Sequence, residues 1–171
     1  MGADELVDLV DARGRVVGEA TLERCLEKGL LHRAVAILVV RRNGAMLLQQ
    51  RSKHDLWHPG LWTISCTGHV RKGEAYDAAA RRELLEELGL DEKPKLVKTY
   101  RLKPIVQGAL TEYERVAFFT CRTESPVTPD PTELEAVREV TLPELRLLLR
   151  RGPLTPDAKL ILTDFLKQKV A

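Results

Sequence analysis

The sequence predicts a single α/β domain with a mixed, largely antiparallel-paired central sheet, and three observations lead to this class. The chain has 171 residues, of which 44% are hydrophobic and 30% charged, enough for one globular core. Short segments rich in β-branched or alternating apolar residues recur along it and are separated by turn residues. Helical patterns stand between them, most clearly over residues 75–88. We find no repeat and no linker, so residues 1–171 are expected to form one domain.

The first 30 residues predict a hairpin followed by a short helix. Residues 5–10 alternate between apolar and polar, 11–14 have turn composition, and 15–19 return as the partner strand. Residues 21–28 then suit a helix that Gly29 ends.

The central strands are expected next. Residues 33–40 are dense in β-branched side chains and predict a buried strand, and Asn43-Gly44 predicts a hairpin turn into a strand over 45–50. The polar segment 51–60, with a turn at Pro59-Gly60, is expected to face the functional site before a short strand resumes.

The last half of the chain predicts further strands over 95–103, 112–121 and 136–140, with a proline-punctuated loop at 125–131. Residues 141–171 are expected to hold two helices. A capping-box pattern at Thr141 and Glu144 starts the first, which runs to Arg150, and Thr155 starts the second, which runs toward Lys169.

Composition excludes several functions. The net charge of +2 is too small to indicate a nucleic-acid binder. The three cysteines, Cys25, Cys66 and Cys121, contain no Cys-x-x-Cys pair, so neither a disulfide framework nor a zinc site is expected and a reducing cytoplasm fits best. Residues 1–9 do not resemble a signal peptide, and the longest apolar run, 34–40, is too short for a membrane span. Oligomeric state is not readable from the sequence.

An acidic helix is the most informative segment. Over residues 75–88 an apolar stripe of Ala80, Leu84 and Leu88, flanked by Ala78, Ala79 and Leu85, predicts a helix that Gly89 ends. Glu83, Glu86 and Glu87 are three or four residues apart and are expected to crowd one side of it. Arg82 alone cannot neutralise them. Mg²⁺ or Mn²⁺, which prefer oxygen ligands, would relieve the repulsion, and such ions bind phosphates as well.

The spacing from Gly68 to Leu90 resembles the complete Nudix box, Gly-x5-Glu-x7-Arg-Glu-U-x-Glu-Glu-x-Gly-U with U aliphatic, and every fixed position is met. The resemblance implies a Nudix α/β/α sandwich and a hydrolase that directs water at phosphorus in a nucleoside diphosphate linked to another group. It implies that Glu86 and Glu87 are the principal metal ligands, with Glu83 a ligand or the base and the Gly68 carbonyl a further ligand. Arg82 would orient the acids, while Glu74 and Gly89 would be structural.

A second resemblance covers more of the chain. Residues 31–34, 62–69 and 112–114 are similar to type I isopentenyl diphosphate isomerases, which share the Nudix fold. In those enzymes residues matching His32, His69, Glu112 and Glu114 belong to a metal site beside a catalytic cysteine. That cysteine directly precedes the glycine, where this chain has Thr67, and Cys66 lies one residue earlier. A shift of one residue in an extended segment turns a side chain to the opposite face.

We therefore expect a hydrolase on an isomerase-like frame, acting on nucleoside 5′-di- or triphosphates or small nucleoside diphosphate derivatives. An isomerase and a non-catalytic nucleotide sensor are the alternatives. Glu112 and Glu114, on one face of a strand, are candidates for further ligands, and Glu114 also for the base, while Cys66 is expected to be a buried hydrophobe. Four residues of the 51–62 region are candidates for substrate contacts, two by charge and two by stacking on a base or packing: Arg51, Lys53, Trp57 and Trp62.

Overall fold

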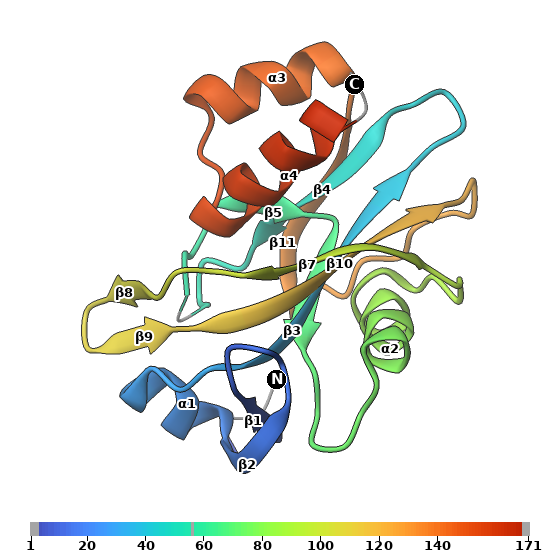
Figure 1. The fold of residues 1–171 in the computed structure, drawn as a ribbon. Coiled ribbons are helices and arrows are strands. Elements are labelled where there is room, and N and C mark those ends of the chain that lie inside the picture. Colours follow the sequence, from blue (N-terminus) through green and yellow to red (C-terminus); the bar gives the residue numbers. More distant parts are fainter. Residues whose placement is uncertain (1–3, 56, 169–171) are drawn as a thin grey trace.

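The computed structural model describes residues 4–55 and 57–168. A nine-stranded mixed sheet lies between helix α2 on one side and helices α3 and α4 on the other (Figure 1). The α/β class and the mixed sheet expected from the sequence are confirmed. In the described part of the chain, no helix is both long and apolar enough to cross a membrane.

The N-terminal hairpin and helix form as predicted. Strand β1 (Leu6–Val10) pairs antiparallel with β2 (Val16–Thr21), and α1 (Leu22–Lys28) follows. The Thr21 hydroxyl caps α1 by accepting a hydrogen bond from the Arg24 N–H, and Gly29 ends it with a φ of 60°. The chain turns after α1, and His32 is the first residue of the central strand.

Strand β3 (His32–Val40) is the centre of the sheet. It pairs antiparallel with β6 (Cys66–His69) and parallel with β10 (Glu114–Arg122). Its pairing with β4 (Met46–Arg51) joins Val40 to Met46. Strand β5 (Trp62–Ile64) and β11 (Leu134–Val140) pair with β4 instead, and β7 (Lys95–Arg101) with β10. Strands β3 and β4 therefore diverge on the N-terminal side of Val40, where β3 pairs with β6 and β4 with β5.

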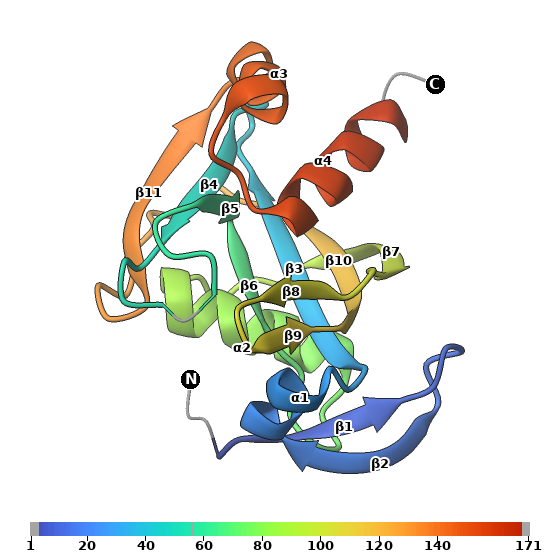
Figure 2. The ribbon, with the colours of Figure 1, turned by 90° about the vertical axis from the view of Figure 1, so that its left-hand side faces the viewer.

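A small second sheet was not predicted. Strands β8 (Ile105–Gln107) and β9 (Leu110–Glu112) form a hairpin whose turn contains Gly108 at a φ of 61°, and Figure 2 shows it beside α1. The expected strand over 112–121 is thus wrong at its start, because Glu112 ends β9 and Glu114 begins β10. The two glutamates do not lie on one face of one strand.

Helix α2 (Tyr76–Leu88) ends at Gly89, which has a φ of 66°, as predicted. Its buried side comprises Ala79, Ala80, Glu83, Leu84, Glu87 and Leu88. The expected flanks Ala78 and Leu85 are exposed instead, and two glutamates take their place against the sheet. Hydrophobic periodicity could not show this, because it assigns charged residues to solvent.

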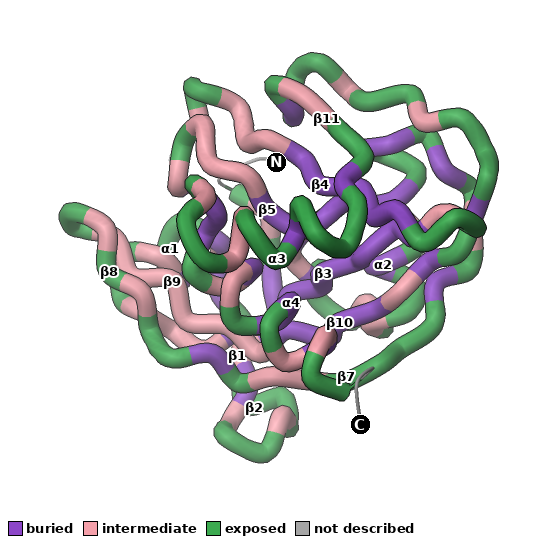
Figure 3. The backbone as a smooth tube through the Cα atoms, turned by 90° about the horizontal axis from the view of Figure 1, so that it is seen from above, coloured by how far each residue is buried: buried purple, intermediate pink, exposed green. Residues whose placement is uncertain are grey.

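The C-terminal helices cover the opposite side of the sheet. Helix α3 (Leu142–Arg151) has the predicted capping box, in which the Thr141 N–H donates to Glu144 over 2.7 Å. Helix α4 (Pro156–Gln168) packs Ala158, Ile161 and Leu162 into the core. The expected end at Lys169 lies outside the described residues. Figure 3 shows burial concentrated in β3, β4 and the adjoining elements.

Candidate active site

Strand register decides which side chains of β6 reach the site. Thr67 and His69 pair with Ala36 and Ala34 of β3, while Cys66 pairs with Ile37. Directly paired residues share a face of the sheet. Thr67 and His69 therefore face the α4 side, and Cys66 is fully buried on the α2 side, as the sequence predicted.

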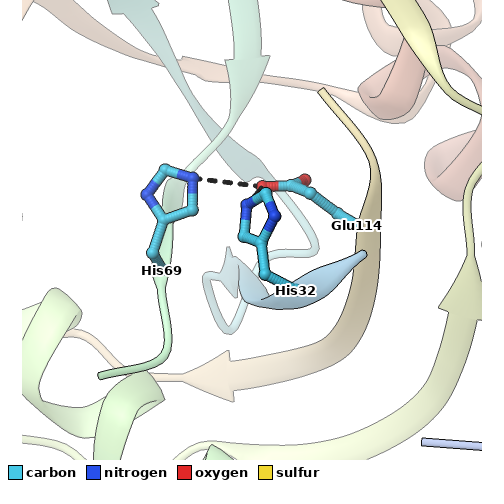
Figure 4. A group of neighbouring side chains, drawn as sticks. All are labelled: His32, His69 and Glu114. Atoms are coloured by element: carbon cyan, nitrogen blue, oxygen red, sulfur yellow. Dashed lines mark ion pairs between the residues drawn. The ribbon is translucent and has the colours of Figure 1, made fainter. Parts of the chain in front are cut away.

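His32, His69 and Glu114 form one cluster on that α4 side. Parallel pairing places His32 beside Glu114 at the start of β3 and β10. The Nε2 atoms of His32 and His69 lie 3.7 and 3.2 Å from Glu114 Oε1, and one donor atom from each side chain falls within 4.8 Å of the others (Figure 4). Two imidazoles and a carboxylate in this arrangement suit a divalent metal ion.

The protonation of His32 fits a metal ligand. Its Nδ1–H donates to the Leu30 carbonyl over 2.9 Å, so in the neutral ring the lone pair is on Nε2. Burial and the neighbouring His69 lower the pKa of His32, which keeps the ring neutral at physiological pH. Nε2 is buried, faces the cluster and lacks a hydrogen-bond partner among the described residues. A cation would supply that partner.

The pKa values of Glu114 and Glu112 are shifted in opposite directions. Burial opposes ionisation of Glu114, yet the two histidines hold the pKa of its carboxyl below the usual value. Burial and the Glu114 carboxylate raise the pKa of Glu112 well above its usual value. Glu112 is outside the three-residue cluster but lines the same cavity.

Arg82 organises the acidic residues of the box. Its guanidinium donates to both oxygens of Glu74 over 2.9 Å, to Glu83 over 2.7 Å, to Glu86 over 3.1 Å and to the His69 carbonyl over 3.0 Å. Burial opposes the charge of Arg82, but these partners raise the pKa of its guanidinium. The Arg71 N–H also donates to Glu74, so Glu74 fixes the turn before α2 to Arg82. Arg82 thus joins Glu74, Glu83 and Glu86 through one side chain.

The three clustered glutamates are not equivalent. Glu83 and Glu87 are 2% and 7% exposed, whereas the Glu86 side chain is 49% exposed. Burial raises the pKa of Glu83 to about 7, and burial together with the Glu83 carboxylate raises the pKa of Glu87 to about 8. Glu87 Oε2 is buried without a hydrogen-bond partner among the described groups. The expected crowding is present, since Glu83 and Glu86 both accept hydrogen bonds from Arg82 Nη1 and the Glu83 carboxylate acts on Glu87, but of the three only Glu86 is open to solvent.

A cavity of about 520 Å³ extends from Glu87 of α2 to His69 and Glu114 of the three-residue cluster. Gly68, His69, Glu87, Glu112 and Glu114 line it, and Arg51 and Trp57 come from the polar segment that the sequence predicted to face the site. Lys53 and Trp62 are not among its lining residues: Lys53 pairs with Glu135 over 2.9 Å, and the Trp62 ring lies under the Arg138 guanidinium.

Asp157 is a lining residue that sequence reasoning missed. It lies in the first turn of α4, and burial and the Glu114 carboxylate raise the pKa of its carboxyl. An acidic residue in a first helical turn is ordinary, which is why the pattern carried no functional signal.

The sheet flanked by α2 and α4, with an intact acidic box on α2 beside β6, defines a Nudix-type enzyme fold. The chain belongs to the Nudix family, since the family model described as NUDIX domain matches residues 30–165. The solved structure of DR0079 from Deinococcus radiodurans superimposes with a TM-score of 0.73 at 22% identity, covering 94% of this chain and 98% of that one. The MutT protein from Methanosarcina mazei gives 0.69 at 18% identity, covering 81% and 95%. These two likenesses concern the fold alone.

Several proteins similar in sequence to this chain are named isopentenyl-diphosphate Delta-isomerases. Isopentenyl-diphosphate Delta-isomerase 2 of Photorhabdus laumondii is 38% identical over 150 residues, which cover 88% of this chain and 85% of the relative. Isopentenyl-diphosphate Delta-isomerase 1 of Mus musculus is 31% identical over 188 residues, covering 95% and 82%. The expected resemblance to both the Nudix hydrolases and these isomerases is thus confirmed.

Proposed function

We propose that this protein is a Mg²⁺- or Mn²⁺-dependent hydrolase that cleaves a diphosphate linkage in nucleoside 5′-di- or triphosphates or small nucleoside diphosphate derivatives. The observation that carries the proposal is the register of β6. It turns Thr67, not Cys66, toward the His32, His69 and Glu114 cluster, while the acidic box beneath it is complete. The cavity thus combines metal-binding groups with no thiol among its lining residues.

The proposed roles follow from the contacts. His32, His69 and Glu114 would hold one cation, and Glu87, with the Gly68 carbonyl, would bind metal beside the diphosphate. When bound, divalent ions neutralise phosphoryl oxygens and favour deprotonation of water. Glu83 has a pKa of about 7, so it can accept a proton at neutral pH and is our candidate for the base. Arg82 positions Glu83, and Glu86 is the solvent-side candidate for a further ligand.

Isomerisation of isopentenyl diphosphate is the second candidate, because relatives of that name are 31–41% identical over most of the chain. Type I isomerases, as the resemblance implies, need a cysteine where Thr67 lies. Burial raises the pKa of the Cys66 thiol well above its usual value, and the neighbouring Glu87 and Glu83 carboxylates raise it further. Such a thiol lies on the α2 side of the sheet and does not face a substrate bound at the His32, His69 and Glu114 cluster on the α4 side.

A substrate panel tests the proposal. Purified protein is incubated with nucleoside di- and triphosphates, nucleoside diphosphate sugars and isopentenyl diphosphate, with Mg²⁺, with Mn²⁺ and with a chelator. Metal-dependent release of a monophosphate or phosphate supports a hydrolase. Conversion of isopentenyl diphosphate with every nucleotide intact would replace it by the isomerase, and tight nucleotide binding without turnover would favour the sensor.

A further inference from the structure

Two buried polar groups in the cavity wall complete no hydrogen bond with the described residues. Gln49, in β4, is 2% exposed, and its Oε1 accepts no hydrogen bond from the part of the chain that the structure describes. Trp57 is 6% exposed, and its Nε1–H makes no completed hydrogen bond, although the indole lies close enough to Glu112 to lower the pKa of that carboxyl. Both residues line the cavity that contains His69 and Glu114.

The position of Trp57 is fixed by its backbone. The Arg51 Nε donates to the Trp57 carbonyl over 2.7 Å, and the Trp57 N–H donates to Asp55 Oδ1 over 3.1 Å. Arg51 also pairs with Asp55 over 2.6 Å. With so little of the side chain exposed, a broad aromatic face is not available for stacking, and the indole N–H is the group left to recognise a ligand.

The cavity also has aliphatic lining residues. Leu22 and Leu26 of α1 and Leu110 of β9 line it, beside Glu23 and Glu27 of α1, and these two elements pack against each other. A flat organic group can therefore lie against leucine side chains while one edge meets polar atoms. Buried polar atoms of folded proteins are nearly always paired, so a carbonyl and an indole N–H left unpaired in a cavity indicate a ligand that pairs them.

We infer that Gln49 and Trp57 are specificity-determining residues for the organic part of the substrate. They recognise a group that presents both a hydrogen-bond donor and an acceptor, as the amide edge of a heterocyclic base does and as a hydrocarbon chain does not. The donor of the ligand pairs with Gln49 Oε1, and its acceptor with Trp57 Nε1. This inference rests on the proposed function, which concerns the diphosphate, and adds which residues select the organic part of the substrate.

Two variants test it. Gln49→Met removes the amide, and Trp57→Phe removes the N–H while keeping an aromatic ring; Gln168→Met, on the far end of α4, is the matched control. We measure kcat and KM for GDP, UDP, CDP, ADP and isopentenyl diphosphate, binding of the same compounds by calorimetry, and Tm. For the best base-bearing compound, each variant is expected to raise KM or Kd about tenfold, with kcat changed less.

The stability readout separates recognition from structure. Gln49→Met keeps the volume of the side chain and is expected to melt close to the temperature of the wild type. Trp57→Phe also shrinks a buried ring and is expected to melt lower, so its loss on base-bearing compounds is compared with its loss on isopentenyl diphosphate. Isopentenyl diphosphate is expected to be equally poor in all proteins. Equal losses on every compound, no loss on any, or wild-type preference for isopentenyl diphosphate would overturn the inference. If no compound is turned over, the proposed hydrolase function fails. The calorimetric Kd values then still decide whether Gln49 and Trp57 recognise the organic group.

Discussion

The Glu83 carboxylate occupies the space that a Cβ at residue 68 would need, so any other residue at the glycine position must displace that carboxylate. Gly68 is not required for a left-handed backbone, since its φ is not among the positive values. Its role is to let a buried acid lie against β6. The first and fourth fixed residues of the box are thus one packing unit.

Gly68→Ala is expected to displace Glu83 and to reduce both activity and stability. Overpacking of this kind costs about 1–3 kcal/mol, and each kcal/mol lowers the Tm of a domain of this size by about 3 °C. Gly18→Ala is the matched control, because a Cβ there meets only Leu9 at 3.8 Å. Thermal melts and turnover check the pair. A variant at position 68 that behaves like the one at position 18 would contradict the packing argument.

Arg82→Lys is expected to reduce turnover by about 10- to 100-fold, the range typical of residues that orient metal ligands. Lysine keeps the charge but cannot reach Glu74, Glu83 and the His69 carbonyl together. Loss of the Arg82 guanidinium also removes the interaction that opposes the raised pKa of Glu83, so the rising limb of the pH–rate profile should move to higher pH.

Arg81→Lys is the control for this variant, because Arg81 is an exposed residue paired with Asp91. It should leave both the rate and the pH profile unchanged. An Arg82→Lys profile that keeps its midpoint would show that Arg82 does not set the ionisation of Glu83.

The raised pKa values of Glu83 and Glu87 predict that a rise in pH has opposite effects on protein stability and on metal binding. Their folded-state pKa values of about 7 and about 8 lie above the usual 4.5, because burial disfavours the charged forms. The stability they give the metal-free protein is therefore complete below about pH 4.5 and is lost as the pH rises through about 7 to 8. Cation binding needs ionised carboxylates, so Mg²⁺ affinity should increase over the same window.

The Glu87→Gln variant checks this effect. In chelator, its Tm should fall less between about pH 5 and 8.5 than that of the wild type, while its activity should be strongly reduced. A wild-type Mg²⁺ affinity that is flat between pH 6 and 8.5 would be incompatible with the raised pKa values.

His32→Gln is expected to weaken Mn²⁺ binding at least about tenfold in calorimetry, because it removes the Nε2 that faces Glu114. His54→Gln is the comparison variant, since His54 is exposed and lines the same cavity but lies outside the three-residue cluster. Equal Mn²⁺ affinities in the two variants would remove His32 from the metal site.

Local signals predicted most of the fold and part of the site. The turn at Asn43-Gly44, the caps of α1 and α3 and the end of α2 at Gly89 depend on nearby residues, and the structure has them. The division between Glu86 and the pair Glu83 and Glu87 could not be predicted, because it depends on the rotation of α2 against β6. The β8–β9 hairpin was missed because three-residue strands leave little periodicity. Asp157 and Gln49 reach the cavity only through tertiary packing.

The most direct test of the account is the fate of the bridging phosphorus–oxygen bond. The enzyme is incubated in ¹⁸O-labelled water with Mg²⁺ and its best diphosphate substrate, and ³¹P NMR follows the products. We predict cleavage, with one ¹⁸O atom entering a released phosphate or monophosphate and no reaction in chelator. An intact diphosphate whose organic group has rearranged would contradict the account.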